Sequence, residues 1–560
     1  MDSPSPTNTR IHQTHSGIDP HSNINPIQLS SSENSDDSPA APLNYELGER
    51  MTGVRHAADA INKTNTAEDE PPLSQVKSNK SIYLTPMERF QEYVGVFPRF
   101  IQVYVTIFCI FLGILSIYWG SLYQRPSRFR NMKFLVVIED VDSFPGTNGN
   151  MVDPLVGNTM RTMLETNETV LSLGNWDIVN LTQFTTLASS HNNTISQEVN
   201  HQVHHQNYWG AIHVLPNSTA QIFTSFAQAD PTFMINGVNS TIQVVYESGR
   251  HFSALNQYVF RHLDLVGETW IRTYVTPQIY SPILQSLNQS QHQAILSSNS
   301  TIAMLNSFPA FSYLDLRPPR SAAVLGPSEL GLIYAQLFSF HQFNFSFEIY
   351  SFMRSKLRFK QFIIYRCILS QINSLILSLV YSLMTIAFQV PVNVAFGRSG
   401  FLVLWMFMYL FMSASAGINE NVVNVIFTYD RKEFIAPWMI LNIVMNISTT
   451  FAPFVLMPGV FRYGYALPMF NTYENLKVVF FDTWKGTLGR NIGVLVAWIV
   501  VMNVLLVFNN RWSYKRSKRV EHEKKAAAQS KEQEEKTGMK QDDSKGSKNT
   551  NEPSSESSSA

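Results

Sequence analysis

Four histidines are the side chains of this sequence that most resemble a set of metal ligands. His201, His204 and His205 lie close together, and His213 follows shortly after them. A zinc site needs several nitrogen, sulfur or carboxylate ligands around one point. No carboxylate or thiolate is fixed beside these histidines by the sequence, and their surroundings are typical of the polar surface of a helix. We therefore predict that the chain holds no metal and no other cofactor.

Three carboxylates, Glu139, Asp140 and Asp142, follow a predicted strand, which is a place where catalytic acids are found. The sequence offers them no partner base, and it contains no Ser/His/Asp signature in a supporting context. It also contains no Gly-x-x-x-x-Gly-Lys-Ser/Thr loop, so the chain has no P-loop for ATP. We interpret the three acids as solvated loop residues and predict that the protein is not an enzyme.

Uncharged polar residues in predicted membrane spans are the next candidates. Asn442 and Asn446 are four residues apart and share one helix face, while Gln371 and Asn373 lie in an earlier span. Two interpretations stay open: hydrogen bonds between helices, or a polar stripe along a substrate route. The five later predicted spans contain no buried Asp, Glu or Lys, and Arg366 lies near a cytoplasmic end. His341 is interpreted as a residue near the headgroups rather than a proton relay.

The elements that must position these residues are mostly membrane helices. The chain has 560 residues with no formal net charge, 15% charged and 12% aromatic residues, which is typical of a polytopic membrane protein. Balanced charge argues against a nucleic-acid partner. Long apolar runs predict an α-helical membrane protein with six transmembrane helices. The runs cover residues 100–120, 323–347, 362–390, 401–418, 435–457 and 492–508.

The predicted domains follow from where these runs lie. Residues 1–85 are a polar, disordered cytoplasmic tail, residues 323–509 a five-helix membrane domain, and residues 510–560 a charged cytoplasmic tail. Residues 121–322, between the first and second spans, are predicted to form an α/β extracytoplasmic domain. The cysteines Cys109 and Cys367 both fall in predicted spans, so that domain has no disulfide. Its predicted strands are 132–138, 176–181, 209–215 and 241–246, and its predicted helices are 151–165, 196–205 and 252–274.

Orientation rests on two signals. Basic clusters at 354–360 and 511–519 belong on the cytoplasmic side by the positive-inside rule, although a third cluster at 125–133 disagrees. Glycosylation sequons, which are used only on the lumenal side, gather between the first two predicted spans. We predict cytoplasmic termini and a secretory-pathway membrane, most readily the plasma membrane. The predicted glycosylation sites are Asn167, Asn180, Asn192, Asn217, Asn239, Asn288 and Asn299.

Several stretches resemble a known family. They are SIYWGSLY at 116–123, KFLVVIEDVD at 133–142, YWGAIHVLPN at 208–217, GPSELG at 326–331 and QFNF at 342–345. Over residues 100–510 the chain is similar to the fungal nitrosoguanidine-resistance membrane proteins, whose common domain has no assigned function. Its layout more distantly resembles the type-2 ABC exporter permeases. The resemblance implies a permease linked to resistance to toxic alkylating compounds, and to lipid distribution across the membrane. It transfers no site residue.

We therefore expect a permease-like protein that exports toxic small molecules such as alkylating agents, or confers resistance to them. The alternative is a non-transporting scaffold or regulator of membrane lipid organisation. The expected partners are membrane lipids, with a separate ATPase or a second copy of the chain as further candidates.

Overall fold

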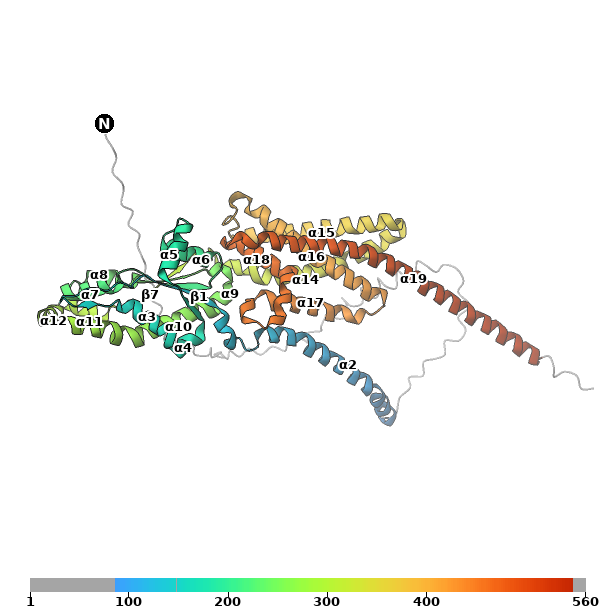
Figure 1. Ribbon diagram of the computed structural model, residues 1–560. Helices are drawn as coiled ribbons and strands as arrows, with labels where there is room; N and C mark the ends of the chain where they lie inside the picture. The colour runs from blue at the N-terminus through green and yellow to red at the C-terminus, as the bar shows by residue number, and fades with distance from the viewer. Residues whose placement is uncertain (1–85, 148, 547–560) are drawn as a thin grey trace, which may run out of the picture. The chain divides into compact units, whose positions relative to one another are not determined.

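A computed structural model of the chain describes residues 86–147 and 149–546 (Figure 1). The predicted tail 1–85 and the last residues of the tail 510–560 lie outside the described residues. The chain divides after Tyr93, and the described residues from Val94 onward belong to one compact unit. This unit contains a five-stranded sheet with its helices and a group of long apolar helices.

The sheet has the strand order β4–β1–β5–β6–β7. β1 pairs in parallel with β4 and β5, β6 runs antiparallel to β5, and β7 runs parallel to β6. Four of these strands lie where the sequence predicted them, whereas β7 was missed. The strands are β1 (Lys133–Ile138), β4 (Asn175–Ile178), β5 (Gly210–Val214), β6 (Ile242–Tyr246) and β7 (Phe311–Asp315), and β2 (Phe144–Pro145) with β3 (Met151–Val152) forms a separate pair.

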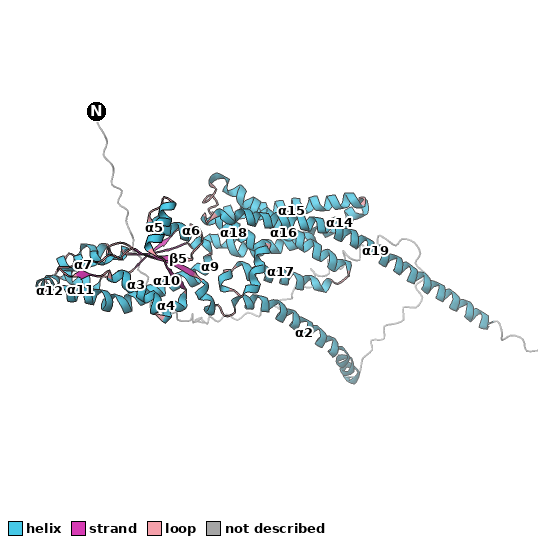
Figure 2. Ribbon diagram, in the orientation of Figure 1, coloured by secondary structure: helices cyan, strands magenta, loops and turns pink. Residues whose placement is uncertain are grey.

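Strand β1 explains why helices cover both faces of this sheet (Figure 2). Phe134 and Val136 belong to a core shared with α3 (Leu155–Thr166), α7 (Ser218–Gln228), α10 (Phe260–Thr269) and the π-helix η5 (Trp270–Tyr280). Leu135 and Val137 point to the other face, against α5 (Leu181–Ser190) and α6 (Ile195–His204). A strand without a polar face is stable only between two layers, as in α/β folds.

Shorter helices complete this region. They are α4 (Glu168–Leu173), α8 (Pro231–Asn236), α9 (Phe252–Ala254), the π-helix η4 (Leu255–Val259), α11 (Ser281–Ser286), α12 (Gln289–Leu296) and α13 (Asn299–Ala303). The predicted helix 252–274 therefore exists, but π-turns interrupt it. Predicted helix 151–165 begins later, at Leu155, because Met151 and Val152 pair as β3.

The remaining described helices are longer or more apolar. They are α2 (Pro86–Leu122), α14 (Gly331–Lys356), α15 (Phe359–Ala387), α16 (Gly400–Thr428), α17 (Ile435–Thr450), α18 (Pro468–Phe481) and α19 (Leu488–Gly546). By length and composition, four helical segments among the described residues can cross a membrane: Phe100–Leu122, Phe359–Ala387, Gly397–Thr428 and Lys485–Ser530. The protein is thus a multi-pass membrane protein.

Two of the six predicted spans are not among these four. The run 323–347 is divided between the π-helix η8 (Gly326–Leu330) and α14, whose polar residues lower its hydropathy. The run 435–457 is cut short because α17 ends at Thr450, before Pro453. Its 16 residues cover about 24 Å, less than the roughly 30 Å of a bilayer core.

Helix α18, which the sequence analysis did not predict, joins the sheet region to the long helices. Nearly all of its residues are buried. Lys477 Nζ donates to Arg250 O at 2.7 Å, and Arg317 Nε donates to Asp482 O at 2.9 Å, just after the helix ends. Gly249 lies so close to it that an added Cβ would be 2.4 Å from Phe481 Cβ. This contact fixes the sheet region against the helical bundle.

The predicted glycosylation sites lie mostly at the surface. Six of the seven asparagines are exposed, and only Asn167 is half-buried. The Asn167 side chain caps α4 by accepting from Val170 N, and it donates to Tyr274 Oη at 3.1 Å. These sites stay predictions, because exposure is necessary for glycosylation but does not establish it.

His251 makes the fold sensitive to acid. It lies at the start of α9 in contact with Tyr473 of α18, and its Nδ1 accepts from Ala254 N. Burial, with the charges of Lys477, Arg125 and Arg250, lowers the pKa of His251 from 6.5 to about 3. The unfolded chain therefore binds this proton below pH 6.5 while the folded chain does not, so the free energy of unfolding falls as the pH drops through that value.

At pH 5.5 we expect this group to have removed about 1.4 kcal/mol of stability relative to pH 7.5. Chemical unfolding at the two pH values measures the loss. In His251→Asn, which keeps a capping acceptor but does not titrate, the difference between the two pH values should shrink by that amount. An unchanged difference in this variant would contradict the assignment.

Candidate functional site in the helical bundle

Helix α16 is the centre of the bundle, packing against α14, α15, α18 and α19. Its small residues Ser413, Ala414, Ser415, Ala416 and Gly417 allow this close approach. An added Cβ at Gly417 would lie 2.8 Å from Met502 Cβ of α19. Since α16 is surrounded, its polar side chains must find partners on neighbouring helices.

Among the described residues of the bundle, one ion pair is almost completely buried on both sides. Arg366 of α15 donates from Nε to Glu420 Oε1 of α16 at 2.5 Å, and from Nη1 to Asn510 Oδ1 of α19 at 2.5 Å. The two charged side chains are 5% and 4% exposed. The guanidinium also lies 5.2 Å from the ring centroids of Phe343 and Tyr350 of α14. One ion pair thus ties four helices together.

Glu420 corrects the prediction that the later spans bury no acid. The predicted span ended at residue 418, where polar residues begin, but α16 continues to Thr428. Glu420 therefore remains inside the bundle, where a lone carboxylate would be very costly and a paired one is tolerated. The sequence did show an arginine and a glutamate in or beside separate apolar segments. It could not show that the two side chains form a pair, because they are far apart in the sequence.

The predicted polar residues of α15 bond to the helices on either side. Gln371 Oε1 accepts from Tyr409 Oη at 2.9 Å and from Ser413 Oγ at 2.6 Å, both on α16. Asn373 Nδ2 donates to Ser346 Oγ of α14 at 3.1 Å. These bonds are of the interhelical kind that the first interpretation expected.

Asn442 and Asn446 of α17 form a second chain of hydrogen bonds. Asn446 Nδ2 donates to Asn442 Oδ1 at 3.0 Å, and Asn442 Nδ2 donates to Asn419 Oδ1 of α16 at 2.8 Å. Asn446 Oδ1 accepts from the backbone N–H of Met469 at 3.3 Å, at the start of α18. The chain thus connects α16, α17 and α18.

The structure brings Asn442 and Asn446 together but keeps them apart from Gln371 and Asn373 of α15. Ser413, which bonds to Gln371, and Asn419, which bonds to Asn442, are six positions apart on α16. At 3.6 residues per turn they lie about 120° apart around the helix. Among the described residues, no hydrogen bond joins the two groups. The four amides therefore do not line one continuous stripe.

An apolar cavity, open on one side, lies between α14 and α15, and several of its lining side chains are more than half exposed. Its volume is about 600 Å³, within the range of small-molecule sites. At one end Tyr381 Oη donates to Pro327 O of η8 at 2.5 Å. Gly331 makes this approach possible, because a Cβ there would lie 2.6 Å from Tyr381 Oη. The lining includes Gly326, Leu330, Phe338, Leu377, Val380, Met384, Phe388 and Met412. Sequence reasoning missed this site, because its residues resemble ordinary lipid-facing ones.

The histidines and acids of the sheet region differ from expectation. Carboxylates lie beside three of the four histidines: Glu198 near His201, Glu247 near His204 and Glu139 near His213. The prediction that no acid is fixed beside them was therefore wrong. Glu198 lies one helical turn before His201 on α6, while strand pairing and helix packing bring Glu139 to His213 and Glu247 to His204.

Asp140 is likewise not a solvated loop acid. It is buried, and its carboxylate accepts from Gly157 N, Thr219 N and Thr219 Oγ1. Asp142 is exposed, as expected. Asp140 thus has a structural role in tying α3 and α7 to the end of β1.

Comparison with known proteins agrees with the membrane architecture. Residues 103–504 match a family described as "Protein of unknown function (DUF3533)". The chain is 30% identical over 468 residues to the uncharacterized endoplasmic reticulum membrane protein YJR015W of Saccharomyces cerevisiae, covering 81% of this chain and 88% of that protein. No solved structure matches the chain. The chain is thus a membrane protein of the secretory pathway.

The Arg366–Glu420 pair should behave as a unit. Arg366→Met alone leaves a buried, unpaired carboxylate, and we expect it to lower the free energy of unfolding by about 3–5 kcal/mol. Arg366→Met combined with Glu420→Leu should be nearly as stable as the parent. Chemical unfolding in mixed micelles measures both variants.

The matched control for this cycle is Arg431→Met, which breaks the exposed Arg431–Glu433 pair and should change almost nothing. Equal losses in the single and double variants would show that the two charges do not compensate each other.

Proposed function

Since this chain belongs to the DUF3533 family, whose function is unknown, we propose a function from its structure: a permease-like membrane protein that binds and moves lipid-like apolar molecules. The observation that carries the proposal is the cavity between α14 and α15. Its lining offers apolar side chains and two tyrosines rather than charges. Such a site favours an acyl chain or an apolar compound over an ion or a sugar.

The proposed membrane region has six spans. α14 has 26 residues, about 39 Å, and is long enough to cross despite its polar residues. The cost of burying these polar side chains is offset by hydrogen bonds. Gln336 Oε1 accepts from Ser415 Oγ, and Gln342 Nε2 donates to Ser370 O. For α17, the short helical segments after Thr450 would complete the crossing. The basic residues 354–360 then lie on the cytoplasmic side with both termini.

The proposed cargo includes toxic small molecules such as alkylating agents, as the family resemblance implied. The same cavity also fits the alternative, a regulator of membrane lipid organisation that binds lipid without moving it. The polar substrate route along Gln371, Asn373, Asn442 and Asn446, a partner ATPase and a second copy of the chain stay proposals.

For location, the yeast relative is named as an endoplasmic reticulum membrane protein. We propose that membrane for this chain as well, ahead of the plasma membrane that the sequence suggested. Both membranes place the sheet region on the lumenal or outer side.

Glycosylation tests this orientation. Digestion with peptide N-glycosidase should increase the gel mobility of the cellular protein, and Asn239→Gln or Asn299→Gln should remove part of that shift. Asn446→Gln, which alters a sequon inside α17, should leave it unchanged. A parent protein whose mobility does not respond to digestion would argue against a lumenal sheet region.

Two glycines give a matched test of the cavity. An added Cβ meets nothing within 4 Å at either Gly326, which lines the cavity, or Gly493, on α19. Gly326→Leu should therefore fold normally and occupy part of the cavity. We expect it to reduce photo-crosslinking of a diazirine-bearing fatty acid severalfold, whereas Gly493→Leu should crosslink like the parent.

Crosslinked peptides from the parent should map to α14 and α15. Equal labelling of the two variants, or labelling confined to other helices, would contradict the proposed site.

A further inference from the structure

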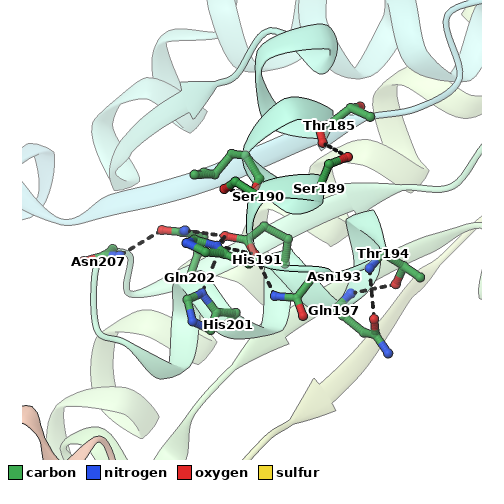
Figure 3. Close-up of polar contacts among 12 residues, drawn as sticks. Thr185, Ser189, Ser190, His191, Asn193, Thr194, Gln197, His201, Gln202 and Asn207 are labelled. Atoms are coloured by element: carbon green, nitrogen blue, oxygen red, sulfur yellow. Dashed lines mark hydrogen bonds and ion pairs between the residues drawn. The ribbon is translucent and has the colours of Figure 1, made fainter.

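His191 and His201 lie close together where α5 meets α6 (Figure 3), and Glu198 lies close to both of them. His191 directly follows α5, and Asn192, with a left-handed φ of 55°, turns the chain back toward α6. Glu198 and His201 are three residues apart on α6, so they share one face. A capping box of Thr194 and Gln197 fixes where α6 begins. Local structure thus places all three side chains together.

The distances from Glu198 to each histidine are close to the edges of a metal polyhedron. Glu198 oxygens lie 3.0 and 3.1 Å from His191 Nδ1, and Oε1 lies 3.5 Å from His201 Nδ1. The three ligand atoms all lie within 4.8 Å of one another. Four ligands at the zinc bond lengths of His and Glu would be about 3.3–3.4 Å apart in a tetrahedron. Small side-chain shifts would therefore complete the set.

The charges at this point favour a cation. The Glu198 side chain is fully buried, and its ion-pair partners among the described residues are histidines only. Its oxygens accept hydrogen bonds from the side-chain amides of Gln202 and Asn193. Among the described residues, His201 Nδ1 is buried and has no hydrogen-bond partner. A buried carboxylate and an unused nitrogen therefore face the same point.

The surroundings would orient such a ligand set. Gln202 Nε2 donates to Glu198 Oε1 at 2.6 Å and Asn193 Nδ2 to Oε2 at 2.8 Å, which are the supporting contacts that metal-binding carboxylates need. The His201 ring contacts the His205 ring in a tilted arrangement, with 3.9 Å between the centroids. The His191 side chain is 40% exposed, so an ion can enter from solvent.

We propose that His191 Nδ1, His201 Nδ1 and a Glu198 oxygen bind one Zn²⁺, with water in the fourth position. Two imidazoles and one carboxylate are a ligand set that zinc accepts. The ion would link the end of α5 to α6 and would thereby stabilise the folded state. The site belongs to the sheet region and does not depend on the proposed transport function.

The test uses the full-length protein in detergent, stripped with a chelator, at pH 7.5. Titration calorimetry with Zn²⁺ should show one saturable site, and bound Co²⁺ should give the visible absorption of a tetrahedral complex. Zinc should raise the thermal midpoint, because it binds only the folded state. Glu198→Gln and His191→Ala should each weaken binding by about 100-fold or more.

His292→Ala, which removes a histidine from α12 of the same region, is the matched control and should bind zinc like the parent. His191 is exposed, so its variant should fold normally even if Glu198→Gln does not. The proposal is overturned if the parent shows no saturable zinc binding, or if His191→Ala binds zinc as tightly as His292→Ala.

Discussion

A polar group inside a bilayer must find its partner within the protein, and the bundle of this chain is arranged around that constraint. Arg366 and Glu420 meet Asn510 and two aromatic rings, so one buried pair fixes α14, α15, α16 and α19. Asn442 and Asn446 of α17 likewise form hydrogen bonds that connect α16 and α17 to α18. Because few alternative pairings satisfy these groups, the polar residues specify which helices are neighbours as well as holding them.

The sheet region is held together differently, because apolar side chains form its core and exclude water from it. Strand β1 is buried on both faces and forces helices onto each side. Helix α18 then connects the two regions through Lys477, Arg317 and the close approach at Gly249. A change in the bundle that moved α18 would therefore reach the sheet region directly, and the reverse would also hold.

The features that could be predicted from the sequence are those that depend on a short stretch of residues. Strands β1, β5 and β6 coincide with mostly apolar runs in the sequence, as do the four membrane-crossing segments, and β4 begins around Trp176. Strand β7 was missed because Phe311–Asp315 is short and only partly buried. The Glu420–Arg366 pair, the acids beside His204 and His213, and the cavity all depend on contacts between distant segments. A single sequence gives no local signal for such contacts.

The cavity between α14 and α15 is the feature of this bundle on which the proposed binding and transport function rests. The most direct test of its function is to reconstitute the purified chain into vesicles and follow the movement of a fluorescent phospholipid between leaflets. Our account predicts faster movement than in protein-free vesicles, and a rate close to the protein-free value for Gly326→Leu. Movement at the protein-free rate with the parent protein, despite a folded bundle, would contradict transport and favour a lipid-binding regulator.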